Sequence, residues 1–429
     1  MTKKTTPSRR EFMKTTAVIG SFSFLPQAIE AFPTMIMKND PLDTASEKNI
    51  IGSYGPWANK LSESPPLLSY RRDDWKSLES WKEKALTKTK ELVSSPEIQD
   101  TPKATINKKY DFEDLEIEEL SWQLPYGQVT EAILLKPKNA VGPLPGVLGL
   151  HDHGGNKYFG KRKITRTNSK MHPKMADHQQ NYYGGTAWAN EIAKRGYVVL
   201  VHDTFTFGSR RVLFENMAEI PWGNCATKGM TDKNPEAIES IDAYNAWAAA
   251  HEHVMSKSLF CGGTTWPGVS LAEDQCALDV LAARDEVDSN RIGCAGLSGG
   301  GLRTVYLGGL DPRIQCAVAV GFMTTWTDFL LYKAYTHTWM IYTPLLPKYL
   351  EFPEILGLRA PLPTMTLNNN QDRLFTLSEM KKADKMLQDV FSKAGAGDKY
   401  KGGFYDGDHK FDKQMQQDAF DWFDQWLNK

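Results

Sequence analysis

Long apolar runs are missing from this sequence: no stretch reaches the roughly 18 consecutive apolar residues of a membrane-spanning helix, so no such helix is expected. An excess of one charge is missing too. The 51 basic and 52 acidic residues give a net charge of −1, and nothing in that balance favours nucleic acid as a partner. Internal repeats and low-complexity tracts do not occur. What remains is a globular composition, with 429 residues for one large domain or two medium ones.

Cysteines are few, and their spacing is not that of a metal site. Cys294 and Cys316 lie in apolar, strand-like runs and are expected to pack in the core. Cys225 and Cys261 lie in one loop-rich segment, where a disulfide is possible if the compartment is oxidising.

The N-terminal residues have the pattern of an export signal. The charged "SRREFMK" at 8–14 precedes the short apolar stretch "TTAVIGSFSFL", and Ala31 supplies a small residue for cleavage. The pair Arg9 and Arg10 resembles a twin-arginine signal, which exports folded proteins. We therefore expect a signal peptide at 1–31 and a periplasmic or extracellular protein. The alternative is a basic tail followed by a short helix.

The rest of the chain is expected to form an extension at 32–111 and an α/β domain at 112–429. The extension contains an amphipathic helix at 74–93. "LEIEELSWQL" and "GQVTEAILLKPK" then alternate as two antiparallel strands. From Pro145 onward strands alternate with helices, which predicts a mostly parallel sheet covered on both faces. Two aromatic-rich segments, 204–269 and 324–360, interrupt this alternation as cap-like insertions.

The motif Gly296-Leu297-Ser298-Gly299-Gly300 carries the strongest chemical signal. It follows the apolar strand 291–295 and begins a helix, so Ser298 would occupy a sharp strand-to-helix turn above the sheet. The alternative is a glycine-rich turn that binds phosphate. A serine nucleophile needs a base, and the base needs an orienting acid.

Position along the chain selects the partners of Ser298. Only His337 and His409 follow it, and His409 in "YDGDHKF" lies before the last helix, where the base is expected, whereas His337 in an aromatic insertion is expected to pack. Asp372 follows the strand 361–367 and is the favoured acid. Asp406 and Asp408 compete, but both are too close in sequence to His409 and are expected to be turn residues.

These motifs resemble the α/β-hydrolase superfamily, in particular exported bacterial hydrolases related to dienelactone hydrolases and acetyl xylan esterases. The matching pieces are "GVLGLHDHGGNK", "GYVVLVHDTFTFGSR", "VDSNRIGCAGLSGGG", "NNNQDRLF" and "GDHKF". The resemblance implies an α/β-hydrolase fold in which Ser298 is the nucleophile, Asp372 the acid and His409 the base. It also implies an oxyanion hole built from the backbone N–H groups of Gly299 and of the turn at His153 and Gly154.

The sequence departs from the family at one position of that turn. Members commonly have glycine after the first histidine, and this chain has Asp152. A metal site at His151, Asp152 and His153 with His202 or Asp203 is the alternative, but no ligand spacing supports it, and no metal or cofactor is expected. His251 and His253 are two residues apart on a helix and do not face each other.

Charges and aromatic residues near the expected site suggest ways to bind substrate. Between His153 and Ala176 the chain has seven basic residues and no acidic one. One interpretation is that Lys157, Lys161 and Arg162 attract an anionic glycan. The alternative is a solvated loop without a role in binding. Aromatic residues of the insertions are expected to form cap cores, and a few would stack on sugar rings or line an acyl pocket. They are Phe205, Phe207, Trp222, Trp266, Trp326, Tyr332, Tyr335, Trp339 and Tyr342.

The predicted function is hydrolysis of a carboxylic ester through an acyl-enzyme. A carbohydrate ester of the acetyl type, on a small molecule or a polysaccharide, is the first expectation, without nucleic acid or a membrane span. The alternatives are a serine peptidase of the same fold and a glycan-binding protein on an inactive hydrolase scaffold.

Overall fold

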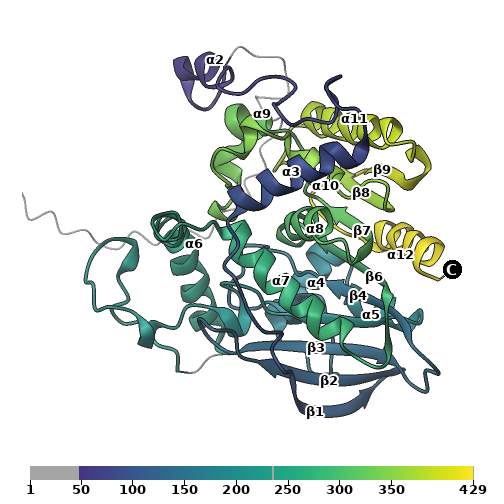
Figure 1. Cartoon of the computed structure of the whole chain (residues 1–429). Helices are drawn as coiled ribbons and strands as arrows, with labels where there is room; N and C mark the ends of the chain where they lie inside the picture. The colour runs from purple at the N-terminus through teal and green to yellow at the C-terminus, as the bar shows by residue number, and fades with distance from the viewer. Residues whose placement is uncertain (1–47, 234–235, 429) are drawn as a thin grey trace, which may run out of the picture. The chain divides into compact units, whose positions relative to one another are not determined.

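The computed structural model describes residues 48–233 and 236–428, and the predicted export signal lies outside them. The described chain forms a nine-stranded sheet in the order β1-β2-β3-β5-β4-β6-β7-β8-β9 (Figure 1). The strands are β1 Thr105–Phe112, β2 Leu115–Trp122, β3 Thr130–Pro137, β4 Leu144–Gly149, β5 Val198–His202, β6 Val287–Leu297, β7 Ile314–Val320, β8 Thr364–Asn369 and β9 Tyr400–Tyr405. β1, β2, β3 and β5 pair antiparallel, and all pairings from β5 to β9 are parallel. The expected mostly parallel α/β sheet is confirmed.

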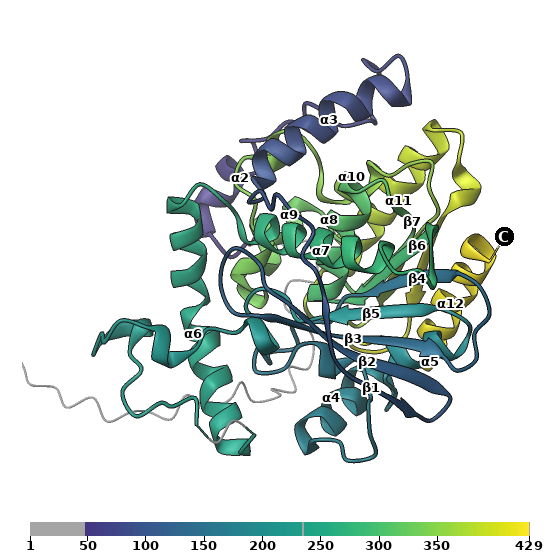
Figure 2. The ribbon, with the colours of Figure 1, turned by 60° about the horizontal axis from the view of Figure 1, so that its bottom comes forward.

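Helices cover both faces of this sheet. Buried side chains of α3, α7, α8, α10 and α11 form one core with one face, and those of α5 and α12, with Tyr183 from α4, form a second core with the other (Figures 1 and 2). The helices are α2 Gly55–Ala58, α3 Leu78–Val93, α4 Pro173–Tyr183, α5 Trp188–Lys194, α6 Ile238–Cys261, α7 Trp266–Ala282, α8 Gly299–Leu310, α9 Trp326–Asp328, α10 Phe352–Gly357, α11 Leu377–Lys393 and α12 Lys413–Leu427.

Residue pattern explains the elements that position the site. β4, β5 and β7 read as nearly continuous apolar runs because both their faces are buried. Helix starts coincide with capping residues: Ser77 accepts from the Ser80 N–H before α3, and Asp412 accepts from two N–H groups before α12. The sheet itself begins at Thr105, so β1 lies largely within the stretch expected to belong to the N-terminal extension.

The first insertion contains α6 and has a small hydrophobic core of its own. Ile241, Tyr244, Trp247 and Ala248 of α6 pack against residues of the loop after β4 rather than against the sheet. The helix lies to one side of the strands (Figure 2). The second insertion consists of short turns, α9, α10 and the 3₁₀ segment Trp339–Ile341. This 3₁₀ segment contacts both α6 and α7. The two insertions therefore meet each other beside the C-terminal ends of the strands.

The possible disulfide between Cys225 and Cys261 does not form, and all five cysteines are free. Asn224, the neighbour of Cys225, contacts His251 and His253 in the middle of α6. Cys261 ends that helix, about 12–15 Å further along its axis. A disulfide requires Cα atoms within about 7 Å, so the two thiols are too far apart.

Across residues 48–233 and 236–428, none of the helices combines the length and hydrophobicity needed to cross a membrane.

Candidate active site

Ser298 occupies the turn between β6 and α8, where the sequence predicts it. Its backbone is strained, with φ +84° and ψ −108°, a conformation that non-glycine residues rarely adopt. Close packing enforces this turn: a Cβ atom on Gly296 or Gly300 would lie 2.3 or 2.0 Å from the Leu150 carbonyl oxygen. We call residues Gly296–Gly301 the β6 turn. At positions 296 and 300 of this turn only glycine fits.

His409 and Asp372 come together at the ends of β8 and β9. The Nδ1 atom of His409 lies 2.6 Å from Oδ2 of Asp372, and Oδ1 of the same carboxylate accepts the Leu374 N–H at 3.0 Å. Asp372 is buried, so its second bond fixes the carboxylate against the histidine. Gly321 leaves room for the ring, since a Cβ there would lie 2.9 Å from its Cε1 atom.

His409 lines the cavity that contains Ser298. His409 Nε2 is buried and has no hydrogen-bond partner among the described residues. Burial alone would lower the pKa of His409, but the Asp372 carboxylate, through its charge and its hydrogen bond, and the charge of Asp152 raise that pKa above its ordinary value. Asp372 therefore favours the imidazolium form that a general base passes through.

The competing residues lie elsewhere. Asp406 accepts from the Asn370 side chain at 3.1 Å, and Asp408 is largely exposed, 3.8 Å from Arg373. His337 packs against Phe329 and Phe375 and its Nε2 lies 2.9 Å from the Leu374 carbonyl oxygen. Burial lowers the pKa of His337 to about 4, so this ring is neutral.

Ser298 and His409 both line a cavity of about 260 Å³. Its walls come from the turn after β4, the β6 turn, the second insertion and the loops after β7, β8 and β9. The lining residues are Asp152, His153, Gly154, Gly155, Tyr182, Leu297, Ser298, Gly299, Phe322, Thr336, His337, Thr338, Met340, Ile341, Leu374 and His409. Of the described residues that line it, none comes from the first insertion, and none is an aromatic residue singled out in either insertion.

The turn after β4, residues Leu150–Gly155, lies against the β6 turn, and we call it the β4 turn. A Cβ on Gly299 would lie 2.8 Å from the His153 backbone nitrogen, so that nitrogen faces the residue after Ser298. Gly154 has φ +50°, which favours glycine at this position. Among the described residues, no hydrogen-bond acceptor takes the N–H of His153 or Gly154.

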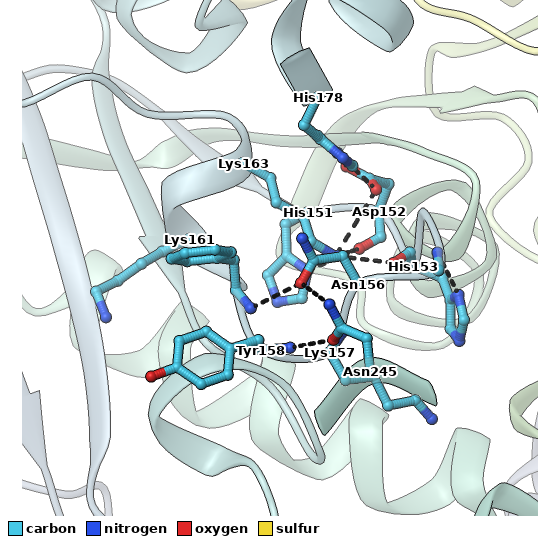
Figure 3. A network of polar contacts seen from close by, with 12 residues as sticks. His151, Asp152, His153, Asn156, Lys157, Tyr158, Lys161, Lys163, His178 and Asn245 are labelled. Atoms are coloured by element: carbon cyan, nitrogen blue, oxygen red, sulfur yellow. Dashed lines mark hydrogen bonds and ion pairs between the residues drawn. The ribbon is translucent and has the colours of Figure 1, made fainter. Parts of the chain in front are cut away.

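Asp152, the residue that replaces the expected glycine, is a buried charge with partners of its own (Figure 3). The Tyr183 hydroxyl donates to Oδ1, and His178 Nε2 lies 3.1 Å from the same atom. Burial alone would raise the pKa of Asp152, but the charges of His178 and Lys163 hold it well below its ordinary value. The carboxylate thus joins the β4 turn to α4.

His153 is held by a residue that sequence reasoning missed. Its Nε2 atom lies 2.7 Å from Oε1 of Glu252 on α6, and its Nδ1 accepts the Gly155 N–H at 3.1 Å. The same Glu252 oxygen accepts from the buried Lys157 ammonium. Burial alone would raise the pKa of Glu252, but Lys157 and His153 lower it to about 2. Glu252 lies between His251 and His253 in the sequence. The only sequence signal for its role was its position on a helix face expected to point inward.

The basic loop does not present its cations to the cavity. Lys157 pairs with Glu252, Lys161 lies 2.8 Å from both Asp203 and Glu131, and Arg162 lies 2.5 Å from Glu236. None of these three cations lines the cavity. The carboxylates that neutralise them come from β3, from the residue after β5 and from the first insertion, segments that no local sequence pattern connects to this loop.

The histidines considered as metal ligands have other partners. His151 Nδ1 lies 3.1 Å from the Asp152 carbonyl oxygen, and His202 lies 3.0 Å from Asp274. The described ranges contain no group of three or more His, Cys, Asp or Glu side chains arranged to hold a metal ion. His251 Nδ1 lies 2.8 Å from the Asn224 carbonyl oxygen and His253 contacts the Asn224 side chain, so each is bound to a loop.

Comparison with known proteins defines the fold. No family model matches the chain. It is 27% identical over 288 residues to YtaP, a proposed hydrolase of Bacillus subtilis, covering 66% of this chain and 79% of the relative. Among solved structures, a proposed acetyl xylan esterase of Bacteroides fragilis aligns with a TM-score of 0.58 at 18% identity, covering 83% and 82% of the two chains. This chain has the α/β-hydrolase fold.

Two further α/β-hydrolase structures align over most of their length. A glucuronoyl esterase from Solibacter usitatus gives a TM-score of 0.53 at 14% identity over 84% of this chain and 96% of its own. A glucuronoyl esterase from Teredinibacter turnerae gives 0.54 at 12% identity over 84% and 88%. In this chain the cavity lies at the C-terminal ends of β4, β6, β7 and β8, the usual position of a ligand site in an open α/β sheet.

Proposed function

We propose that this α/β-hydrolase is a serine esterase that cleaves a carboxylic ester. One observation carries the proposal: a strained, cavity-lining Ser298 shares its cavity with the free Nε2 of His409, whose Nδ1 lies 2.6 Å from the buried Asp372 carboxylate. Nucleophile, base and orienting acid are the three groups that acyl transfer needs, and they occur in the chain order of this fold.

In the proposed reaction the Ser298 hydroxyl oxygen attacks the ester carbonyl while His409 Nε2 takes its proton. His409 then gives that proton to the departing alcohol, and an acyl-serine remains. A water molecule, deprotonated by His409, attacks the acyl carbon. The bond from that carbon to the serine oxygen then breaks, His409 returns the proton to this oxygen, and the acid is released. Asp372 keeps the Nδ1 proton in place throughout, which fixes the tautomer that has a lone pair on Nε2.

The tetrahedral oxyanion would be stabilised by backbone N–H groups of Gly299 and of His153 and Gly154. Support comes from the approach of the His153 nitrogen to Gly299 and from the unused N–H groups of the β4 turn. In such sites one donor is worth about 10²–10³ in kcat. Neither a metal nor a cofactor takes part in the proposed steps.

The proposed substrate is a carbohydrate ester, with an acetyl-type acyl part first. Proteins named acetyl xylan esterase and glucuronoyl esterase share the fold. The cavity is small, at about 260 Å³, and its lining among the described residues contains no lysine or arginine, which suits a small neutral acyl group. A panel of p-nitrophenyl esters of increasing acyl length and acetylated or methyl-esterified glycans tests this choice.

The nucleophile is tested with Ser298→Ala. We expect kcat to fall by about 10⁴–10⁶, because the residual rate comes only from binding and oxyanion stabilisation. Ser289→Ala, an exposed serine on the same strand, is the matched control. A fluorophosphonate probe should label wild type and the control but not Ser298→Ala. Unlabelled wild type without esterase activity would instead favour a glycan-binding protein on an inactive scaffold.

The acid is tested with Asp372→Asn. The base works only when neutral, so kcat/KM of wild type should rise with pH through a His409 pKa above the ordinary value. Without the Asp372 carboxylate, burial lowers the His409 pKa and only the charge of Asp152 opposes it, so the pKa should fall, and kcat should drop by about 10⁴. Asp408→Asn, at an exposed turn, should retain wild-type kcat; the reverse pattern would make Asp408 the acid.

We also propose export, with residues 1–31 as a twin-arginine-type signal; the sequence alone supports it. Replacing Arg9 and Arg10 by lysine should leave the precursor in the cytoplasm, as read by fractionation against wild type. Equal export of both forms would contradict the proposal.

A further inference from the structure

Lys163 is a fully buried cation whose closest contacts are to backbone oxygens. Its Nζ atom lies 2.7 Å from the carbonyl oxygen of Asp152 and 2.9 Å from that of His153 (Figure 3). The Asp152 carboxylate is further away, with Oδ2 at 3.8 Å. Lys163 thus acts mainly on two consecutive peptide groups of the β4 turn. Hydrogen bonds from an ammonium group are about twice as strong as those between neutral groups.

The geometry of the peptide bond converts these contacts into an orientation. In a planar trans peptide the C=O and the following N–H point in opposite directions. The carbonyl groups of Asp152 and His153 both point to Lys163, so the N–H groups of His153 and Gly154 point away from it. The His153 nitrogen faces Gly299, beside Ser298. A cation on the carbonyl side also polarises the peptide, which strengthens its N–H as a donor.

We propose that Lys163 is the positioning residue of the oxyanion hole: its buried ammonium holds the carbonyl groups of Asp152 and His153 so that the N–H groups of His153 and Gly154 face the reacting carbonyl. This inference rests on the proposed esterase function. The family motif has glycine at position 152, and a glycine there would supply no carboxylate near the buried Lys163 ammonium. The contact between Lys163 and the β4 turn is therefore not part of that motif.

Other contacts define how far the turn depends on Lys163. The His153 carbonyl oxygen also accepts the Asn156 N–H at 3.1 Å, so the second peptide has another support. His151 Nδ1 lies 3.1 Å from the Asp152 carbonyl oxygen. Burial lowers the pKa of His151 well below its ordinary value, so this ring is a neutral partner and Lys163 is the charged one. Loss of Lys163 should therefore disturb the orientation of the His153 N–H more than that of the Gly154 N–H.

The test replaces Lys163 by methionine, which keeps the length and the apolar stem but removes the charge. We expect kcat on p-nitrophenyl acetate to fall by about 10–100-fold with little change in KM, because misplaced groups act on the transition state. Lys174→Met is the matched control: this cation in the first turn of α4, eleven residues after Lys163, pairs with Asp242 at the surface and should retain wild-type kcat.

A phenylboronic acid inhibitor gives a readout that a general loss of stability does not move. Its adduct with Ser298 places an oxygen in the oxyanion hole, so its affinity should fall by the same factor as kcat in Lys163→Met. If methionine prevents folding, Lys163→Gln carries the test: its amide retains two donors, and we expect a kcat between that of wild type and one hundredth of it. Circular dichroism and thermal unfolding verify each variant.

The outcomes separate the two proposals. Wild-type kcat and boronate affinity in folded Lys163→Met, or in Lys163→Gln when methionine does not fold, would overturn the role of Lys163. An equal loss in Lys174→Met would also overturn it, because the effect would then not be specific to Lys163. Hydrolysis that persists in Ser298→Ala would instead overturn the esterase proposal itself.

Discussion

The two turns that flank the cavity are built on opposite principles. The β6 turn is held by backbone packing: its glycines let α8 approach the Leu150 carbonyl so closely that a single Cβ would collide. The β4 turn is held by buried charge. Lys163 binds its carbonyl groups, Glu252 binds its histidine, and α4 binds its aspartate.

This contrast separates two kinds of vulnerability. Steric support fails when an atom is added, and it is indifferent to pH because no ionisable group takes part. Ionic support fails when one partner is lost, since a buried charge left alone is strongly destabilising. Ser298 is thus presented rigidly, and the groups that would stabilise the proposed oxyanion depend on side chains from three separate elements.

The largest effect is expected from adding one methyl group to the β6 turn. In Gly300→Ala the new Cβ would lie 2.0 Å from the Leu150 carbonyl oxygen, so β4 or α8 has to move. We expect a loss of about 3 kcal/mol or more in the free energy of unfolding, measured with urea. The control is Gly397→Ala, whose new Cβ would have its nearest neighbour at 3.7 Å. This substitution should change the free energy of unfolding by less than about 0.5 kcal/mol. Equal stability of the two variants would contradict the claim that close backbone packing supports the β6 turn.

A smaller loss is expected from neutralising one charge behind the β4 turn. Glu252→Gln keeps the shape but leaves the buried Lys157 without its carboxylate and weakens the hold on His153. We expect about 1–3 kcal/mol less stability and about a tenfold lower kcat. The control Glu239→Gln lies exposed on the same helix. If both variants equal wild type, the ionic support is dispensable.

High pH should affect the β4 turn alone. Burial lowers the pKa of Lys163 to about 8, although the charges of Asp152 and Asp203 oppose this; Lys157 and Arg303 lower it further. Above that pH the ammonium loses its proton, and the change from a charged to a neutral donor is worth about 1 kcal/mol, or about fivefold in kcat. Wild type should lose this factor between pH 7 and 9.5, and Lys163→Gln should not. A fall of the same size in both would place the titrating group elsewhere.

Salt should have the smallest effect. The cations of the loop after β4 that were expected to attract an anionic substrate are each paired with a carboxylate, which leaves little net charge to attract an anion. The pairs of Lys157 and Lys161 are also largely buried, where salt screens less than at exposed charges. We expect kcat/KM for an anionic ester to change by less than about twofold between low salt and ~0.5 M. A fall of tenfold or more would restore the loop as an electrostatic guide for substrate.

The β6 turn and the groups around it were accessible from sequence because each signal is local. Five residues with glycine at fixed positions, after an apolar run, specify a strand-to-helix turn, and chain order then points to Asp372 and His409. The alternation of strands and helices predicts the sheet for the same reason: hydrophobic period is a property of short windows.

The support of the β4 turn was not accessible, because its members are far apart in sequence. Glu252 lies 99 residues from the His153 ring that it holds. The loop cations looked like a surface for anions because their carboxylates come from other elements, and sequence shows charge without showing what neutralises it. Asp152 seemed an anomaly for the same reason: its partners on α4, His178 and Tyr183, become visible only in the fold.

Glu252 also has a second bond, which matters for exchanging parts between related hydrolases. Its Oε2 accepts the Trp339 N–H at 3.3 Å, and Ser256 on the same helix donates to the Trp339 carbonyl at 3.2 Å. The segment that lines the cavity is therefore fastened to a helix that does not line it. A chimera that swaps only the cavity-lining insertion would break these bonds, so the transferable module is both insertions together.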